Sequence, residues 1–374
     1  MIKRLAVLLA VLALVAAACG GESDDSSTTT EGPTETTATT SAPGGQAGGT
    51  LAEVTTRGTL RCGVSTTAIG FAEPQDDGSY TGFDADYCRA VAAAVFGDAT
   101  AVVFVGLTAA ERFTALANGE VDVLFRNTTW TQSRDTEIGG DFGPTTFYDG
   151  QQVMGKKELL PNGDDSTLAD VDGARLCTNA GTTTEKNITE GAAVVGATIS
   201  LVTTEDFEQA MGLFRDGSCD LVTTDGSGLF GERFDAVAKG EIADGDWVIF
   251  PKAPISKEPL GPMYRQNDSE WADIVNWVVY ATFIADEKGI TKANVADAIA
   301  SPPDPEAGRL LGVTDDELQT EMGLSADAFA NVISLVGNYD DIYVGNLAAL
   351  GFSRTNSPND QWFRGGLIYA PPAR

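Results

Sequence analysis

Four short polar clusters in the sequence contain side chains suited to holding a small charged molecule. With one arginine further along the chain, they supply hydroxyl groups, an amide, one carboxylate and two guanidinium groups. A guanidinium can hold a carboxylate through two hydrogen bonds, a carboxylate can accept from an ammonium, and helix N-termini favour anions. The set is therefore complementary to a small zwitterion. The clusters are Ser65-Thr66-Thr67, Arg126-Asn127-Thr128-Thr129, Gly181-Thr182-Thr183 and Thr224-Asp225, and the additional arginine is Arg134.

Each of these groups also has a purely structural interpretation. Arg134 stands beside Asp135 and could form a surface ion pair with it. Asp225 stands where a strand turns into a helix, which is a typical position for an N-cap, and Ser/Thr clusters at helix starts are also common caps. Arg126 could pair with an acidic residue elsewhere in the fold. The sequence leaves these alternatives open.

Composition excludes several classes of chemistry. The chain contains no histidine, which removes His-dependent triads, histidine zinc sites and the most common general base. A formal charge of −30 argues against nucleic acid, because phosphate binding needs a basic face. No two cysteines form a CxxC pair, so we expect no metal site and no cofactor. After Cys19, the remaining cysteines are Cys62, Cys88, Cys177 and Cys219. In an exported protein an even number suggests disulfides, with three possible pairings.

The polar clusters follow predicted strands that alternate with predicted helices. Strand, helix and strand repeat with short connections, which is typical of an α/β sheet with parallel strands. In such sheets ligands bind beyond the carboxyl ends of the strands, where the clusters lie. The predicted strands are 59–64, 101–105 and 121–125 in a first cycle, and 174–178, 199–203 and 220–224 in a second.

The two cycles predict two lobes that are interleaved along the chain. A body of about 320 residues exceeds one ordinary single-core domain. A strand at 261–266 and a helix at 271–286 follow the second cycle, so the first lobe is expected to use both ends of the body. We predict that residues 51–150 and 257–374 form lobe 1, that residues 151–256 form an inserted lobe 2, and that a cleft between them unites the clusters.

The first fifty residues predict export and a membrane anchor. Lys3 and Arg4 precede an apolar run at 5–18, which is shorter than the roughly 20 residues that span a bilayer. Residues 1–18 are therefore interpreted as a signal peptide. The alanines before Cys19 resemble a bacterial lipobox, although Ala16 stands where leucine is usual, so ordinary cleavage without lipid at Cys19 is the alternative. Residues 19–50 are rich in Ser, Thr and Gly and predict a flexible tether.

Several long segments resemble the extracellular substrate-binding proteins of polar amino-acid ABC importers, and within them the general L-amino-acid-binding branch. The resemblance extends over residues 58–374. The segments that carry it are CGVSTTAIGF, GFDADYCRAVAAAVFGDA, LTAAERFTALANGEVDVLFRNTTWTQSRDTEIGGDF, GTTTEKN, CDLVTTDGSGL, ISKEPLGPMYRQND and GGLIYAPPAR. The resemblance implies an α/β periplasmic-binding-protein fold of type II, the Venus-flytrap fold, in which two lobes are joined by a two-strand hinge.

The resemblance also implies roles for residues that contact the amino-acid backbone. Arg134 matches the arginine that clamps the α-carboxylate, and Thr129 and Thr183 match hydroxyl or backbone positions that assist it. Thr182 lies beside them. Asp225 matches the carboxylate that receives the α-ammonium group.

Three further positions are assigned to the ammonium contact and to selectivity. Asn127 matches a strand-end position whose backbone carbonyl contacts the ammonium. Ser65 falls where narrower relatives place a larger specificity residue, so its small size favours a broad pocket. Arg126 is the candidate for pairing with an acidic side chain.

The sequence thus predicts a monomeric, non-enzymatic binding protein that delivers L-amino acids to the permease subunits of an ABC importer. It would be broad in specificity, would favour acidic or amide side chains, and would be held at the membrane by its lipid anchor. The alternative is an enzyme on the same fold, since cyclohexadienyl dehydratases resemble these proteins. Glu73 and Asp225 would then be the available acid or base.

Overall fold

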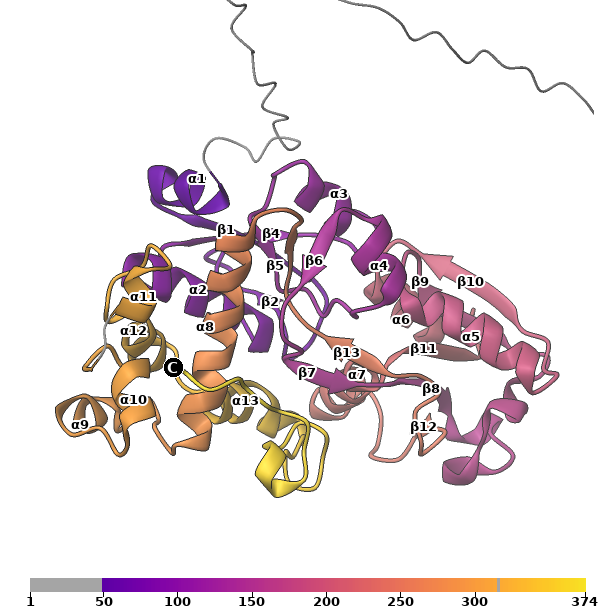
Figure 1. Cartoon of the computed structure of the whole chain (residues 1–374). Helices are drawn as coiled ribbons and strands as arrows, with labels where there is room; N and C mark the ends of the chain where they lie inside the picture. The colour runs from indigo at the N-terminus through magenta and orange to yellow at the C-terminus, as the bar shows by residue number, and fades with distance from the viewer. Residues whose placement is uncertain (1–48, 315–316) are drawn as a thin grey trace, which may run out of the picture. The chain divides into compact units, whose positions relative to one another are not determined.

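The computed structural model describes residues 49–314 and 317–374 (Figure 1). The predicted signal peptide, Cys19 and nearly all of the predicted tether lie outside the described residues. Helix α1 (Thr50–Arg57) begins one residue inside the predicted tether, where the Thr50 backbone nitrogen donates to the Asp268 carboxylate at 2.7 Å. The first described helix therefore starts at the last residue of the predicted tether. The described residues all belong to one compact unit.

The first of two five-stranded sheets is built from both ends of the body. Its strands are β1 (Leu60–Val64), β4 (Val102–Gly106), β5 (Val123–Leu124), β6 (Gly140–Phe142) and β14 (Met263–Arg265). Their order is β4-β1-β5-β14-β6, with β1 parallel to β4 and β5 and with β14 antiparallel to β5 and β6. β1 has apolar, largely buried residues because helices cover the sheet.

The second sheet is built from the middle of the chain. Its strands are β8 (Gln151–Lys156), β9 (Arg175–Asn179), β10 (Ser200–Thr204), β11 (Leu221–Asp225) and β12 (Trp247–Phe250). Their order is β10-β9-β11-β8-β12. Strand β9 runs parallel to β10 and β11, whereas β8 is antiparallel to β11 and β12. The two predicted α/β cycles thus correspond to two separate sheets.

The helices begin and end at residues that the local sequence explains. Helix α2 (Phe83–Phe96) follows Gly82, whose φ of 127° only glycine adopts readily, and buries ten of its 14 residues. The other helices are α3 (Arg112–Ala117), α4 (Gln132–Glu137), α5 (Thr183–Val194), α6 (Phe207–Arg215), α7 (Gly226–Ala238), α8 (Ser269–Glu287), α9 (Val295–Ala300), α10 (Pro305–Leu310), α11 (Glu317–Thr320), α12 (Ala328–Leu335) and α13 (Tyr339–Leu347).

Smaller elements complete the chain. They are the strands β2 (Glu73–Pro74) and β3 (Tyr80–Thr81), and the 3-10 helices η1 (Lys157–Leu159), η2 (Gly163–Asp165), η3 (Leu168–Val171), η4 (Ala348–Leu350) and η5 (Trp362–Arg364). Among the described residues, no helix combines the length and apolar character that crossing a bilayer requires.

Two adjacent strands carry the chain between the sheets. Strand β7 (Phe147–Asp149) leads into the second sheet and β13 (Glu258–Leu260) leads back. Figure 1 shows the two strands side by side. They pair antiparallel, with Glu258 opposite Asp149. Two α/β sheets joined by a two-strand hinge confirm the predicted type II fold. The exact lobe boundaries at residues 150/151 and 256/257 remain a prediction.

The C-terminal region packs against the hydrophobic core beside the first sheet and forms hydrogen bonds to residues in and next to the hinge strand β7. Helices α12 and α13 bury apolar residues against α2 and α8. The Tyr339 hydroxyl donates to the Thr146 carbonyl at 2.8 Å. The Asn359 side chain accepts from the Tyr148 nitrogen at 2.7 Å and donates to the Tyr148 carbonyl at 3.1 Å. The Asn359 side chain thus bonds to both backbone groups of Tyr148 in β7, as a neighbouring strand would.

Each sheet also carries one disulfide to an adjacent element. Cys62 in β1 bonds to Cys88 in α2, and Cys177 in β9 bonds to Cys219 just before β11. In both pairs the Cα atoms are 5.9 Å apart. Of the three pairings that the sequence allowed, the structure has the one in which each disulfide stays within one α/β cycle.

Candidate functional site

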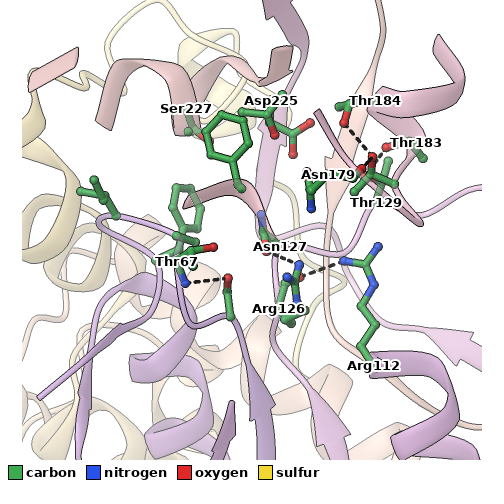
Figure 2. Close-up of a pocket in the computed structure, with 18 residues that line it drawn as sticks. Thr67, Arg112, Arg126, Asn127, Thr129, Asn179, Thr183, Thr184, Asp225 and Ser227 are labelled. Atoms are coloured by element: carbon green, nitrogen blue, oxygen red, sulfur yellow. Dashed lines mark hydrogen bonds between the residues drawn. The ribbon is translucent and has the colours of Figure 1, made fainter. Parts of the chain in front are cut away.

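A pocket lies at the carboxyl ends of the parallel strands of both sheets. Seven of the eight predicted site residues line it. In the first sheet the last residue of β1, Val64, pairs with the last residue of β4, Gly106. In the second sheet the last residues of β10 and β9, Thr204 and Asn179, pair in the same way. The residues that follow these parallel strands therefore lie at one edge of each sheet. Figure 2 shows side chains from both sheets converging on this space. The predicted residues that line it are Ser65, Arg126, Asn127, Thr129, Thr182, Thr183 and Asp225.

Asp225 occupies an N-cap position without capping its helix. It is the residue before α7, but its carboxylate accepts no capping hydrogen bond from that helix. The side chain is buried, and its Oδ1 has no hydrogen-bond partner in the described part of the chain. An unpaired buried acceptor costs about 1–3 kcal/mol. The capping alternative therefore does not explain this carboxylate, which is available to a ligand group in the pocket.

Two hinge carboxylates stand near Asp225 and influence its charge. Burial, followed by repulsion from Asp149 and Glu258, raises the pKa of Asp225 well above its usual value, while Arg134 and Arg112 lower it. Burial likewise raises the pKa of Asp149 to about 6. Glu258 accepts hydrogen bonds from Ser256 and from residues at the start of α5. Of these three carboxylates only Asp225 lines the pocket, and a cationic ligand group beside it would favour its ionised form.

Arg134 is the one predicted site residue that does not line the pocket. It is buried, donates from Nη1 to the Thr129 carbonyl at 3.0 Å, and stacks on Phe113 with its guanidinium carbon 5.2 Å from the ring centroid. The suggested surface pair with Asp135 does not form. Arg134 therefore lies directly behind Thr129, because the short helix α4 turns it inward.

Two threonines connect the two sheets beside Arg134. The Thr129 and Thr183 hydroxyls are 3.4 Å apart, and Thr183 donates to the Glu258 carboxylate at 2.8 Å. Thr182 has the structural role that the sequence left open, since its hydroxyl accepts from the Glu185 nitrogen at 3.1 Å and caps α5. The N-terminus of α5 and its backbone donors thus face the pocket beside Thr129.

The floor of the pocket is formed at the end of β5. Asn127 has a φ of 33°, and its nitrogen donates to the Asp84 carboxylate at 2.7 Å. Arg126 donates from Nε to the Leu107 carbonyl at 3.0 Å and from Nη1 to the Asn127 side-chain oxygen at 3.1 Å. Ser65 is buried and its hydroxyl accepts from the Thr67 nitrogen at 3.3 Å.

Eleven lining residues were not among the eight predicted contact residues, although Thr67 and Thr224 belong to the predicted polar clusters. Two of the eleven carry strong polar groups. Arg112 begins α3 and is 2% exposed, although an arginine at a helix start gives no sequence signal of burial. Asn179 ends β9, one residue beyond the predicted strand, so recognising it required only a longer strand. The others are Thr67, Ala68, Ile69, Phe71, Thr184, Phe207, Thr224, Ser227 and Gly228.

Glu73, the second carboxylate of the enzymatic alternative, does not line the pocket. It accepts from the Gly70 nitrogen at 2.7 Å and so stabilises the loop after β1. Within the described residues, no group of three or more carboxylates or cysteines is placed to hold a metal ion.

Comparison with known proteins places this geometry in a family. Residues 60–286 match the bacterial extracellular solute-binding proteins, family 3. The chain is 44% identical over 329 residues to the general L-amino acid-binding periplasmic protein AapJ of Rhizobium johnstonii, covering 87% of this chain and 93% of AapJ. It is 44% identical over 334 residues to the glutamate/glutamine/aspartate/asparagine-binding protein BztA of Rhodobacter capsulatus, covering 88% of this chain and 95% of BztA.

A solved structure agrees over nearly the whole body. An ABC transporter periplasmic binding protein from Brucella ovis, with glutathione bound, has a TM-score of 0.81 and 45% sequence identity. The match covers 87% of this chain and 99% of that chain. These findings confirm the family predicted from the sequence. The chain belongs to the bacterial extracellular solute-binding proteins, family 3.

Proposed function

We propose that the protein captures L-amino acids outside the cytoplasm and delivers them to the permease subunits of an ABC importer. The observation that carries this proposal is the unpartnered, buried carboxylate oxygen of Asp225, which lies in a pocket that also contains arginine side chains. A zwitterionic α-amino acid supplies a cation for the first and an anion for the second. The names of AapJ and BztA, two relatives of nearly the same length, support this ligand class.

The backbone groups of the ligand are assigned as follows. The α-ammonium group donates to Asp225 and to the Asn127 carbonyl. The α-carboxylate binds beside Thr129 and Thr183, where Arg134 and the N-terminus of α5 stabilise its charge. Among residues 49–314 and 317–374, the Arg134 guanidinium donates one hydrogen bond, from Nη1 to the Thr129 carbonyl, so its other nitrogens are available as donors. Closure of the two lobes over the ligand would then present the loaded state to the importer.

Two substitutions test this assignment. Arg134→Ala and Asp225→Ala should each weaken amino-acid binding by at least tenfold, because a hydrogen bond to a charged group contributes about 1.5–3 kcal/mol. Isothermal titration calorimetry measures the loss, and circular dichroism checks the fold. Asp244→Ala, which removes an exposed carboxylate near the second sheet, is the control. Unchanged affinity in both Arg134→Ala and Asp225→Ala would refute the assignment.

A γ-glutamyl peptide is a second candidate ligand. The Brucella ovis structure was solved with glutathione bound, and this chain matches 99% of it at 45% identity. A γ-glutamyl peptide keeps the free α-amino and α-carboxyl groups that the proposed site recognises. Calorimetric competition between glutathione and the preferred amino acid distinguishes the two, since a shared site predicts mutually exclusive binding.

We also propose that the protein is not an enzyme, is a monomer, and is exported and anchored through a lipid on Cys19. The relatives carry the names of binding proteins, which supports the first point. Mass spectrometry of the bound amino acid should show no conversion. Cys19→Ser should move the protein from the membrane fraction to the soluble fraction, and an unchanged distribution would contradict the anchor.

A further inference from the structure

Helix α7 is capped by the hinge and not by the residue at its own N-cap position. Asp225 stands at that position but makes no capping bond. The Gly226 nitrogen donates instead to the Gly150 carbonyl at 2.9 Å, and the Ser227 nitrogen donates to the Asp149 carboxylate at 3.4 Å. The end of the hinge strand β7 therefore takes the first two N–H groups of α7, which have no partners within the helix.

Two glycines allow this close approach between the strand end and the helix. A β-carbon on Gly226 would lie 2.6 Å from the Gln152 side-chain oxygen and 3.1 Å from the Gly150 carbonyl oxygen. A β-carbon on Gly150 would lie 2.8 Å from the Ser256 carbonyl oxygen. Any other residue at either position would push the hinge strand and α7 apart.

Asp149 uses one carboxylate oxygen for two bonds. Its Oδ1 accepts from the Gly150 nitrogen at 2.8 Å as well as from the Ser227 nitrogen. Its Oδ2 is buried and has no partner within residues 49–314 and 317–374. Asp149 does not line the pocket. It therefore acts on a ligand in the pocket through α7 and Asp225, without touching the ligand.

Capping from the hinge leaves the Asp225 carboxylate for the pocket. An aspartate at the N-cap position normally accepts from the second or third backbone nitrogen of its helix. In α7 the second nitrogen belongs to Ser227, which already donates to Asp149. Figure 2 shows Asp225 among the side chains that line the pocket. The bond from Asp149 thus removes the partner that would otherwise turn Asp225 back toward its own helix.

We propose that Asp149 is a positioning residue for the ammonium site, because it caps α7 from the hinge and keeps the Asp225 carboxylate directed into the pocket. This inference rests on the proposed function, since it assumes that Asp225 binds the α-ammonium group of the ligand. It adds a hinge residue, which was not among the predicted site residues, to the groups that determine ligand affinity.

The charge of Asp149 supplies a readout that a merely structural role would not change. Burial, followed by repulsion from Asp149, raises the pKa of Asp225. A neutral amide at position 149 should lower the pKa of Asp225, so that Asp225 stays ionised at a lower pH. The other charged or titratable groups that act on this pair are Glu258, Arg112, Arg126, Arg134 and Tyr343. They are the same in the wild type and the variant.

The first test compares the affinity of three variants for L-glutamine, a probe without a titrating side chain. In isothermal titration calorimetry of the full chain at pH 8, Asp149→Ala should bind it at least tenfold more weakly than the wild type. Asp149→Asn keeps the acceptor oxygen and should restore the affinity to within threefold. Asp304→Ala is the matched control, because Asp304 caps α10 by accepting from the Ala307 nitrogen at 2.9 Å and lies outside the pocket.

The second test repeats the titrations at pH 5. The wild-type affinity should fall from pH 8 to pH 5, because a protonated Asp225 no longer pairs with the ammonium group. In Asp149→Asn this fall should be at least threefold smaller. Asp304→Asn should show the same fall as the wild type. Protonation of Asp84 is common to all these proteins, so it does not produce a difference between them.

The results separate this inference from the proposed function. Wild-type affinity in Asp149→Ala would overturn the positioning role, and so would equal weakening in Asp149→Ala and Asp304→Ala. If Asp149→Ala does not fold, the pH comparison decides, because an equal fall in Asp149→Asn and the wild type would also overturn the role. A wild type that binds none of the twenty L-amino acids would instead contradict the proposed function.

Discussion

Asp84 lies beneath the pocket and makes stability depend on pH. Its carboxylate is buried at the start of α2, and burial raises its pKa to about 7, although the Asn127 nitrogen and Arg126 act in the opposite direction. The folded state therefore binds this proton more tightly than the unfolded state, whose pKa is near 3.8. The resulting stabilisation is lost as pH rises through the interval from about 4 to 7, at about 1.4 kcal/mol per pH unit.

The ligand-free protein should accordingly unfold at a lower temperature at pH 8 than at pH 5, by several degrees. Asp149, whose pKa is raised to about 6, contributes in the same direction. Asp84→Asn should reduce the slope, because the amide oxygen can still accept from Asn127 without titrating. Asp76→Asn, at an exposed position, should leave the slope unchanged. Thermal unfolding across this range tests the prediction, and a Tm that rises from pH 5 to pH 8 would contradict it.

The polar side chains of the sequence predicted that a pocket exists, but they did not predict all the residues that line it. Asp225, Asn127 and Thr183 were predicted because they follow strands, and the structure brings them together. Arg112 was missed because its burial results from contacts with residues distant in sequence, and a charged residue at a helix start normally faces water. Arg134 was predicted to clamp the α-carboxylate, and this role stays a proposal; the structure shows its guanidinium bonded to the Thr129 carbonyl.

At the scale of elements, the buried ion pair between Arg354 and Asp286 attaches the C-terminal segment to α8. Arg354 donates to the Asp286 carboxylate at 2.6 Å and to the Asp340 carboxylate at 2.5 Å, and its guanidinium stacks on Tyr339. The side chains of Arg354 and Asp286 are 6% and 8% exposed. These carboxylates raise the pKa of Arg354 further, so it is always charged.

Removing this arginine should strongly destabilise the fold. Arg354→Ala leaves Asp286 buried without its main counter-charge, and breaking a buried pair costs about 3–5 kcal/mol. Lys186→Ala is the control, because the side chains of the Lys186–Glu190 pair are 76% and 65% exposed and surface pairs contribute roughly 0–1 kcal/mol. Chemical denaturation measures both. Similar losses for the two variants would show that the Arg354 network does not hold this segment.

The strands were predictable to within a few residues, and the C-terminal packing was not. Predicted strands 174–178, 199–203 and 220–224 each lie one residue before β9, β10 and β11. Alternation of apolar runs and turns involves residues that are close in the sequence, so the strands can be predicted from the sequence alone. The attachment of Asn359 to β7 joins residues 211 positions apart, and no local pattern encodes it.

At the scale of the whole molecule, the two hinge strands lie close to the proposed ligand site. The carboxylates of Asp149 and Glu258 belong to the hinge strands and influence the charge of Asp225. A contact between Phe230 of α7 and Phe352, with ring centroids 5.9 Å apart, also joins the second sheet's helix to the C-terminal segment. Ligand binding at the strand ends and any rearrangement at the hinge therefore involve neighbouring groups. This arrangement fits the proposal that the importer recognises the loaded state.

The most direct test of amino-acid capture is a calorimetric titration of the solubilised full chain with each of the twenty L-amino acids. We predict binding at micromolar concentration or tighter for at least one, with L-glutamate and L-aspartate the strongest, which corresponds to about 8 kcal/mol or more. If the folded protein bound none of the twenty amino acids, this result would contradict amino-acid capture.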